Sequence, residues 1–303
     1  MATQNKISLL VPCFNASAFI GAFLKHITAI DFSEVIFYND GSNDNTLEIL
    51  INSGCKYLTS DVNNGPGFAR NRLAEAATND YIHFHDIDDE FNPDFIKLVN
   101  EKIIIQPDVI LGNADWIDEH TRDLLIRWEY NEERIKDDAL DYFISNPLGI
   151  INTVYKRNFF LNLGGFNEKI NCWEDADIHI RMAMKNATFE VINQTLAYSV
   201  RHDHGISKNQ EWCWECRFQY LKNYLVELPV ANRKAVVCEI AKCAQVFYNH
   251  KKNDFFMECY NICKKHNILL PGTNNKILNL LKKLNFPPGI LYYIQHLARK
   301  CFD

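Results

Sequence analysis

The 303-residue chain lacks the features that would assign it to a secreted or membrane-spanning class. No apolar leader segment precedes the first apolar run at 7–11, because residues 1–6 are polar. No stretch reaches the roughly 18 uncharged apolar residues that a membrane-spanning helix needs. Internal repeats are also absent. We therefore expect a globular protein of the cytoplasm, and the hydrophobic content of 47% is sufficient for a substantial core.

The 10 cysteines lack the setting of a disulfide framework. They are scattered through a long chain without a secretion signal, which favours reduced thiols. One pair, Cys213 and Cys216, has CxxC spacing, but no second CxxC accompanies it. Its surroundings are typical of a helix interior, so the pattern does not favour a zinc or redox site.

Charge is unevenly distributed along the chain, although the total is only −6. Residues 1–230 carry 20 basic and 34 acidic side chains, a net charge of −14, and residues 231–303 carry 12 and 4, a net charge of +8. The basic segment 276–300 joins apolar side chains to cations, which suits a helix lying on an anionic membrane surface. Packing on its own domain or on a second subunit is the alternative. The acidic body and the lack of a base-stacking motif argue against nucleic acid.

Strand-like and helix-like segments alternate through the first two thirds of the chain. Such alternation predicts a mostly parallel sheet with helices on its faces and ligands at the carboxyl ends of the strands. Strands are expected at 7–11, 34–38, 56–59, 81–85, 109–113, 150–155, 190–192 and 197–200, and helices at 17–30, 45–52, 68–77, 174–185, 235–248 and 254–266. The charged segment 115–141 has no clear period.

Three carboxylates, Asp86, Asp88 and Asp89, follow the strand that begins at Tyr81. Like charges this close repel each other, and a bound divalent cation would relieve the repulsion. A solvated turn is the alternative, because aspartate favours turns through hydrogen bonds to nearby backbone. Since ligands of open α/β sheets bind at the carboxyl ends of strands, we interpret the cluster as a metal site that faces a phosphate.

Two earlier strand ends carry candidate nucleotide ligands. Pro12 is expected to end the first strand, which would leave the backbone of Phe14 and Asn15 free to hydrogen-bond a nucleobase. Asp40 follows the second strand, where a carboxylate can accept a hydrogen bond from a base or a ribose hydroxyl. Ser42, Asp44 and Thr46 are expected to cap the next helix. A proline that merely ends a strand is the alternative reading of Pro12.

Arg70 follows the turn Gly65-Pro-Gly67 and lies at the start of an expected helix. The glycines allow the backbone to approach a ligand closely, and the amino terminus of a helix favours anions. Arg70 therefore suits a diphosphate or a base, and Asn71 could hydrogen-bond either. A surface salt bridge is the alternative for Arg70.

Glu174 and Asp175 open another expected helix, directly after Trp173. Acids in a first helical turn are often present only for the helix dipole, which is the alternative to a catalytic role. Trp173 could stack on a sugar face. Further along, Arg201-His-Asp-His204 follows the last strand, and a neutral imidazole there is a reasonable metal ligand. A lone surface histidine is the alternative, and His204 is chosen over His202 only because it better fits the spacing of the family described below.

The chain resembles the family 2 glycosyltransferases of the GT-A fold over roughly residues 5–210. The resemblance rests on six segments in the family's order, each weak alone: Val11-Pro-Cys-Phe-Asn15, Asp40-Gly-Ser-Asn-Asp-Asn-Thr46, Gly65-Pro-Gly-Phe-Ala-Arg-Asn71, His85-Asp-Ile-Asp-Asp89, Gly164-Gly-Phe166 and Trp173-Glu-Asp175. It implies a Rossmann-like GT-A domain with a mostly parallel mixed sheet flanked by helices, which we expect over 1–225. The helical spacing and basic charge of the remaining residues predict a helical, basic extension over 226–303. His85 departs from the family pattern, in which an aliphatic residue commonly precedes the first acid.

The resemblance also assigns roles to residues. It implies an inverting, metal-dependent displacement in which Asp175, beside Glu174, is the general base. Asp86-Ile-Asp88 becomes the DxD motif for Mn²⁺ or Mg²⁺, with Asp88 the direct ligand, Asp89 supporting it and His204 a further ligand. The expected nucleotide contacts are Pro12, Phe14, Asn15, Asp40, Arg70, Asn71 and Asp86, and the expected sugar or acceptor contacts are Asn113, Asp115, Trp116 and Trp173.

The function that follows is transfer of a hexosyl or N-acetylhexosaminyl group from a nucleotide-sugar donor, expected to be a UDP-sugar. The acceptor would be a hydroxyl of a glycan or lipid-linked glycan in surface polysaccharide synthesis, reached from the cytoplasm or the inner face of the plasma membrane. A GT-A-like nucleotidyltransferase is one alternative, opposed by the Glu174-Asp175 pair. An inactive binding or scaffold module is another, opposed by the presence of all the acids. Homo-oligomer formation stays open.

Overall fold

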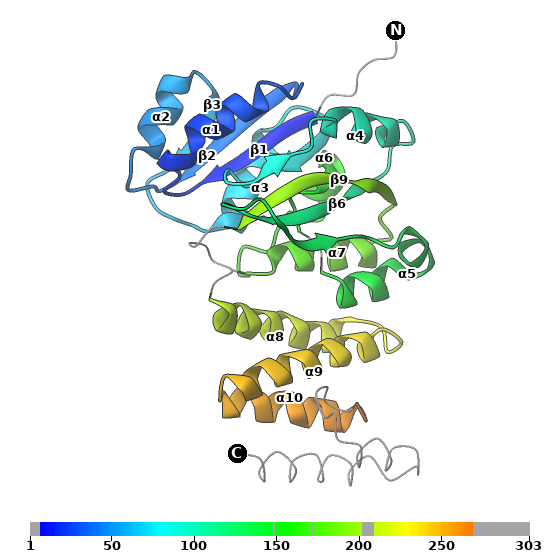
Figure 1. The fold of residues 1–303 in the computed structure, drawn as a ribbon. Helices are drawn as coiled ribbons and strands as arrows, with labels where there is room; N and C mark the ends of the chain where they lie inside the picture. The colour runs from blue at the N-terminus through cyan, green and yellow to red at the C-terminus, as the bar shows by residue number, and fades with distance from the viewer. Residues whose placement is uncertain (1–6, 148, 171, 202–208, 269–303) are drawn as a thin grey trace. The chain divides into compact units, whose positions relative to one another are not determined.

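The structure, a computed structural model, describes residues 7–147, 149–170, 172–201 and 209–268 (Figure 1). The chain divides into two compact units, the first of residues 1–143 and 147–205, the second of 144–146 and 206–303. The boundary expected at residue 225 lies within α8 (Gln210–Glu227), near its end. The basic segment 276–300 and His204 lie outside the described residues, so the membrane and ligand roles expected of them stay predictions.

A nine-stranded sheet forms the first unit. Its strands are β1 (Ile7–Cys13), β2 (Glu34–Asp40), β3 (Lys56–Ser60), β4 (Tyr81–Phe84), β5 (Glu90–Phe91), β6 (Val109–Asp118), β7 (Leu124–Trp128), β8 (Thr153–Lys156) and β9 (Phe189–Arg201). The order is β3-β2-β1-β4-β8-β6-β9-β5, and β7 pairs with β6. Strands β1 to β4, β6 and β9 run in one direction, whereas β5, β7 and β8 run against them. The carboxyl ends of the six parallel strands therefore meet at one edge.

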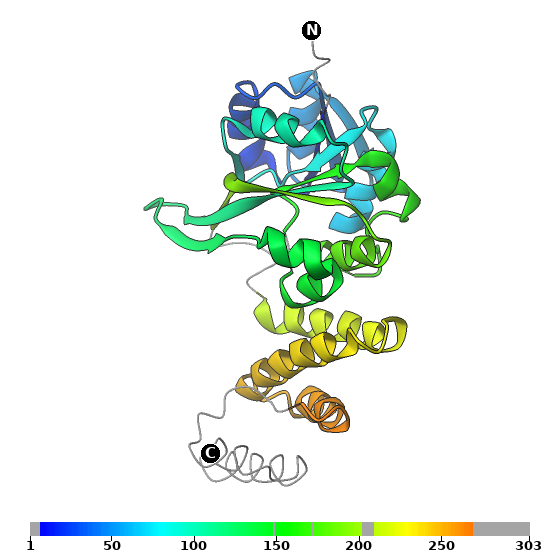
Figure 2. The same cartoon turned by 90° about the vertical axis from the view of Figure 1, so that its right-hand side faces the viewer.

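Helices cover both faces of this sheet (Figure 1). Those described in the first part of the chain are α1 (Ser17–Ile27), α2 (Thr46–Ser53), α3 (Pro66–Ala76), α4 (Phe95–Ile103), α5 (Glu132–Ser145), α6 (Arg157–Asn162) and α7 (Glu174–Met184). Helix α3 begins with Pro66 directly after Gly65, whose φ of 92° suits only glycine. Strands β6 and β7 form a hairpin that extends well beyond its neighbours (Figure 2).

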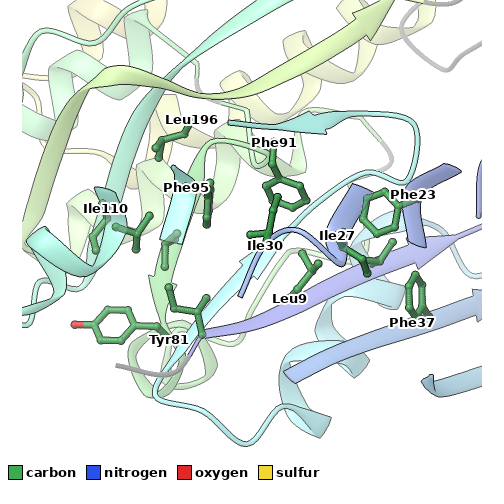
Figure 3. Packing of buried hydrophobic residues seen from close by; sticks show 14 of the residues in the cluster. Leu9, Phe23, Ile27, Ile30, Phe37, Tyr81, Phe91, Phe95, Ile110 and Leu196 are labelled. Atoms are coloured by element: carbon green, nitrogen blue, oxygen red, sulfur yellow. The ribbon is translucent and has the colours of Figure 1, made fainter. Parts of the chain in front are cut away.

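The main hydrophobic core lies between the sheet and helices α1, α2 and α4. Leu9 of β1 points into it, because alternate side chains of a strand point to one face. Phe23 of α1 and Phe95 of α4 pack over the strands, with Phe91 between them (Figure 3). On the opposite face, Phe84 contacts aromatic rings from β8, α6 and the turn at Phe166. Both faces of β4 are thus buried, which fixes the position of the residues that follow it.

Most expected elements are present, with three differences. Pro12 does not end β1, which pairs with β2 through Cys13. On the β4 side of β1, the Leu10 carbonyl accepts a hydrogen bond from the His85 backbone N–H. The backbone of Pro12, two residues on, faces the same side, but β4 has already ended there. The N–H that proline lacks would therefore have had no strand partner, and no hydrogen bond of the sheet is lost. The strands expected at 190–192 and 197–200 are one long strand, β9. The segment 115–141, left without a prediction, completes β6 and forms β7 and part of α5.

The second unit contains α8, α9 (Arg233–Asn249) and α10 (Asn253–Lys265). Arg217 and Glu239 form a buried ion pair between α8 and α9, with 2.6 Å between Nη2 and Oε2. The nine cysteines in the described part of the chain have free thiols, and burial raises the pKa of Cys243 to about 12. None of the helices described is long and apolar enough to cross a membrane.

Candidate active site

The acid loop, residues 85–89, leaves the carboxyl end of β4. Asp86 and Asp88 are partly exposed, whereas Asp89 is buried. The Asp89 carboxylate accepts a hydrogen bond from the Val200 backbone N–H at 2.9 Å. Burial, and then the charges of Asp86 and Asp88, raise the pKa of Asp89 well above its usual range. Asp89 therefore ties the loop to β9, which leaves Asp86 and Asp88 as the carboxylates that face solvent.

Arg70 joins the acid loop to α7. From the buried face of α3, its Nη2 donates to Oδ1 of Asp86 at 2.8 Å and its Nη1 donates to Oε1 of Glu174 at 2.6 Å. The Arg70 side chain is 7% exposed, and that of Glu174 is 11% exposed. Burial opposes the charge of Arg70, but the two carboxylates outweigh it and raise the pKa of its guanidinium. Two acidic motifs far apart in the sequence are thus held at one cation.

Two buried histidines, His83 of β4 and His85 of the acid loop, contact each other at the start of the loop. His83 Nδ1 lies 2.8 Å from the Thr153 carbonyl oxygen and must donate to it, so His83 Nε2 accepts from His85 Nδ1 at 3.2 Å. Burial lowers the pKa of His83 to about 3 and that of His85 well below its usual value, so both are neutral. The His85 ring stacks on Phe91 with centroids 3.6 Å apart. His85 therefore fills the aliphatic position of the family pattern as a packing residue.

Sequence reasoning missed this histidine pair. The available signal was the spacing of His83 and His85, which places both side chains on one face of a strand.

Asp175 lies in the first turn of α7 and is partly exposed. Its Oδ1 accepts a hydrogen bond from the Ala176 N–H at 2.7 Å. Burial, and then the neighbouring charge of Glu174, raise the pKa of Asp175 to about 7. Behind it, His179 Nδ1 lies 2.6 Å from the Asp175 carbonyl oxygen, and His179 Nε2 lies 3.0 Å from the Tyr155 hydroxyl. A carboxylate with this pKa, held by a fixed helical turn, is suited to accept a proton near neutral pH.

The expected nucleotide contacts at the ends of β1 and β2 lie beside each other. Phe14 is 48% exposed, and Asn15 follows it with a φ of 50°. Asp40 is buried and accepts from the backbone N–H groups of Asn64 at 3.0 Å and Gly65 at 2.8 Å. Asp40 thus holds the loop that leads into α3, and its contact with a base or ribose stays a prediction.

The capping role expected of Ser42, Asp44 and Thr46 is confirmed for Asp44 alone. Asp44 Oδ1 accepts from the backbone N–H of Thr46, the first residue of α2, at 3.0 Å, although the N-cap position itself is Asn45. The other Asp44 oxygen accepts from the N–H of the first residue of α1 at 3.1 Å, and Ser42 accepts from the Asn15 N–H at 3.0 Å. These side chains join the loop after β1 to the loop after β2. The reason is tertiary, because two parallel strands end side by side here.

Asn71 holds the turn at Gly164-Gly165. Its Oδ1 accepts from the Phe166 N–H at 2.8 Å and its Nδ2 donates to the Phe166 carbonyl at 2.9 Å. A Cβ on Gly165 would lie 2.3 Å from Asn71 Oδ1, so only glycine fits there. The amide of Asn71 is therefore engaged in the protein, and a nucleotide contact by Asn71 stays a prediction.

The expected sugar contacts of β6 lie on both faces of that strand. Asn113 is buried and accepts from the Tyr130 N–H at 3.3 Å. Asp115 is buried and receives two bonds from Arg127, at 2.9 Å from Nε and 2.8 Å from Nη2. Trp116 is partly exposed and points to the other face. Arg201 and Trp128 stack on its ring, so a ligand could contact only the edge of the ring.

Trp173 is partly exposed next to the acids of α7, with a φ of 76° at the helix N-cap. Among the described residues, no group of three or more histidine, cysteine or carboxylate side chains lies together as a metal cluster. The structure therefore brings together Arg70, Asp86 and Glu174, whereas it leaves the metal ligands untested.

The chain is similar to known proteins in sequence and in fold. The model of the family "Glycosyl transferase family 2" matches residues 8–162. The uncharacterized glycosyltransferase YibD of Escherichia coli is 34% identical over 123 residues, which are 38% of this chain and 36% of YibD. The processive diacylglycerol beta-glycosyltransferase of Mycoplasma pneumoniae is 36% identical over 107 residues, 32% of this chain and 31% of the relative. The matched parts are thus about a third of each relative's length.

Among solved structures, TarS 1–349 of S. aureus superposes with a TM-score of 0.61 at 19% identity, covering 88% of this chain and 81% of that chain. Likeness at this level of identity concerns the fold alone. It confirms the expected α/β architecture, a mostly parallel mixed sheet flanked by helices.

Proposed function

Because the chain belongs to glycosyl transferase family 2, whose model matches half of it, we propose that it transfers a sugar from a nucleotide-diphosphate donor to a hydroxyl of a glycan or lipid-linked glycan. The observation that carries this proposal is the double ion pair of Arg70, which brings the acid loop and the first turn of α7 into one site. The positive charge of Arg70 offsets the repulsion between the two sets of carboxylates, so they can lie beside each other.

The donor we propose is a UDP-sugar, with a hexosyl or N-acetylhexosaminyl group. TarS of S. aureus has been solved in complex with UDP-GlcNAc and with UDP. A relative from Staphylococcus epidermidis, 32% identical over 94 residues, is a poly-beta-1,6-N-acetyl-D-glucosamine synthase. These likenesses support a UDP-linked donor and a surface polysaccharide as the product.

The reaction we propose is a single in-line displacement. Asp175 accepts the proton of the acceptor hydroxyl, and that oxygen forms a bond to the anomeric carbon while the bond from this carbon to the diphosphate oxygen breaks. The configuration at the anomeric carbon is inverted. Near neutral pH a substantial fraction of Asp175 is ionised and yet basic enough to take the proton, since its pKa is about 7. Arg70 keeps Asp86 and Glu174 in place throughout.

Asp86 and Asp88 would hold a Mn²⁺ or Mg²⁺ ion. Both offer carboxylate oxygens at the solvent-facing side of the acid loop, and one Asp86 oxygen is already bound by Arg70. Such ions commonly take one or two protein carboxylates and complete their coordination with substrate phosphates and water. When bound, the ion would neutralise charge on the departing diphosphate. His204 remains the proposed further ligand.

The test is thermal unfolding of the purified protein with a panel of nucleoside diphosphates, each with Mn²⁺ or with a chelator. We expect UDP with Mn²⁺ to raise the melting temperature by about 5–10 °C when UDP is present at about 100 times its Kd. Asp88→Ala should abolish the shift. Asp94→Ala is the matched control, because Asp94 is an exposed acid just beyond the loop.

The products of donor turnover separate the alternatives. Release of UDP supports a glycosyltransferase, and release of pyrophosphate would assign a nucleotidyltransferase instead. If no nucleotide shifts the melting temperature, the site does not bind a nucleotide and the scaffold alternative replaces this proposal.

A further inference from the structure

Three flat side chains form a row on the extended part of β6, β7 and β9. The rings of Trp116 and Trp128 stack with centroids 5.2 Å apart and planes inclined by 28°. The Arg201 guanidinium carbon lies 3.4 Å from the Trp116 ring centroid. We call Arg201, Trp116 and Trp128 the stacking row.

Strand register fixes the order within the stacking row. Trp116 pairs with Ser199 of β9 on one side and with Ile126 of β7 on the other. Arg201 is two residues from Ser199 and Trp128 is two residues from Ile126, so all three flat groups lie on one face of the sheet. Trp116 is therefore covered on both ring faces, by Arg201 from β9 and by Trp128 from β7.

Trp128 is the outer member of the stacking row. In the described part of the chain, β7 pairs with β6 alone, and the Trp128 ring has no aromatic or cation neighbour besides Trp116. Trp128 is partly exposed, and the preceding residues of β7 are exposed. The ring face directed away from Trp116 thus lies at a free edge of the sheet.

The inner end of the stacking row meets the acid loop. Asp89 binds the backbone N–H of Val200, the residue before Arg201. Burial lowers the pKa of Arg201, and the carboxylates of Asp89 and Asp88 act in the opposite direction, so this guanidinium is within electrostatic reach of the loop. The stacking row therefore runs outward from the side of the site where the donor diphosphate is proposed to bind.

The chain beyond Trp128 leads to the proposed base. Tyr130, two residues on, is buried and receives a hydrogen bond from Asn152 Nδ2 at 2.9 Å. Burial is the main cause that raises the pKa of Tyr130, and the charge of Asp175 adds to it. Trp128 is thus two residues from a side chain that lies within electrostatic reach of Asp175, the proposed base.

We propose that the outer face of Trp128 is a subsite for a sugar unit of the acceptor glycan, at least one unit away from the reacting hydroxyl. This inference rests on the proposed function. A pyranose presents a face of C–H groups that carry a small positive charge, which complements the negative face of an indole ring. Trp116 stacks on the inner face of the Trp128 indole, and Arg201 stacks on Trp116 in turn, so the orientation of the indole is fixed. The subsite selects acceptors of two or more sugar units.

The test uses the full-length protein, saturated with UDP and Mn²⁺, on an immobilised array of bacterial surface glycans and their fragments of one to six sugar units. Wild type should bind fragments more tightly as they lengthen beyond one unit. Trp128→Ala should weaken the binding of these longer fragments about tenfold and leave single sugars unaffected. Trp128→Phe should retain most of the affinity.

Two further variants keep the test sharp. Leu124→Ala is the matched control, since Leu124 is 51% exposed on the same strand and pairs with Ile117, whose side chain points to the face opposite that of Trp116. Trp128→Leu keeps apolar volume beside Trp116 and removes the aromatic face, and it should lose affinity as the alanine variant does.

The inference is overturned if the Trp128 variants bind glycans as wild type does, or if wild type binds no glycan at all. The UDP-dependent rise in melting temperature reports separately on the proposed function. If that rise is retained while Trp128→Ala and Trp128→Leu bind normally, only the acceptor subsite is wrong. If the rise is absent from wild type, the proposed function itself has failed.

Discussion

Replacing Arg70 by methionine should destabilise the first unit strongly. The substitution keeps an unbranched apolar stem and removes a charge that serves two carboxylates, at 2.8 Å and 2.6 Å. Glu174 would then be buried beside Asp175 without a counter-charge. Breaking a buried ion pair from one side costs about 3–5 kcal/mol. Asp86 is 39% exposed and adds less than about 1 kcal/mol, because water screens it.

Differential scanning calorimetry is the assay. A loss of about 4 kcal/mol corresponds to a fall of about 8–16 °C in the melting temperature of a unit of this size. Arg72→Met is the matched control, because Arg72 lies on the same helix with a side chain that is 39% exposed and pairs with Glu75 at the surface. That variant should lose less than about 1 kcal/mol.

A double variant tests the physical reason. In Arg70→Met with Glu174→Gln, no uncompensated charge stays buried at position 174, so more than half of the loss should be recovered. The reasoning is refuted if the two single effects add to within about 0.5 kcal/mol, since independent sites behave that way. It is also refuted if Arg70→Met costs no more than Arg72→Met.

Two more predictions concern the base and a turn. The kcat/KM for sugar transfer should rise with pH through about 7 as Asp175 loses its proton. Glu174→Gln should move the midpoint of this rise to lower pH, because the charge of Glu174 helps to raise the pKa of Asp175. A kcat/KM that does not change from pH 5 to 8 would contradict the assignment of Asp175 as the base. Gly41→Ala should cost clearly more unfolding free energy in urea than Gly54→Ala, whose cost is about 1–2 kcal/mol. Both have φ near +70°, but a Cβ on Gly41 would lie 2.4 Å from the Val62 backbone, and one on Gly54 meets nothing within 4 Å; equal losses would refute this.

The pH prediction also has a stability counterpart with a definite sign. Asp175 has a folded-state pKa of about 7, above its ordinary value of 3.8. The folded protein therefore binds more protons than the unfolded chain between these values. The stability that this group contributes is complete below about pH 4 and is lost as the pH rises through 7. Asp175→Asn should remove that part of the pH dependence.

Local patterns in the sequence determined much of the fold. Apolar alternation and helical spacing report on burial within one element, so strands such as 56–59 and helices such as 174–185 were expected within a residue or two of their observed ends. The same patterns failed at 115–141, where β7 is exposed along its length and carries no amphipathic signal. The same patterns predicted two separate strands where β9 is continuous, because the pairing register between β9 and β6 shifts near Asn113.

Chemical identity was likewise readable from sequence, but the partners of each group were not. The acids of the loop and of α7 could be selected by residue type and by their place at element ends. That one arginine joins them was decided by the tertiary structure, since Arg70 lies 16 residues from Asp86 and 104 residues from Glu174. Chain proximity carries no information about such contacts.

The sequence by itself therefore determined the order of the elements, the family resemblance and the candidate acids. Only the tertiary structure decided what each polar group does, because burial and neighbouring charges set its state. Asp175 is an ordinary carboxylate in the sequence and acquires a pKa of about 7 from its surroundings. His85 appeared to be an irregularity in a metal motif, and in the folded protein it is a neutral ring packed on Phe91. Trp128 belongs to no motif in the sequence, and only the pairing of β7 with β6 places it at the end of a row of stacked groups.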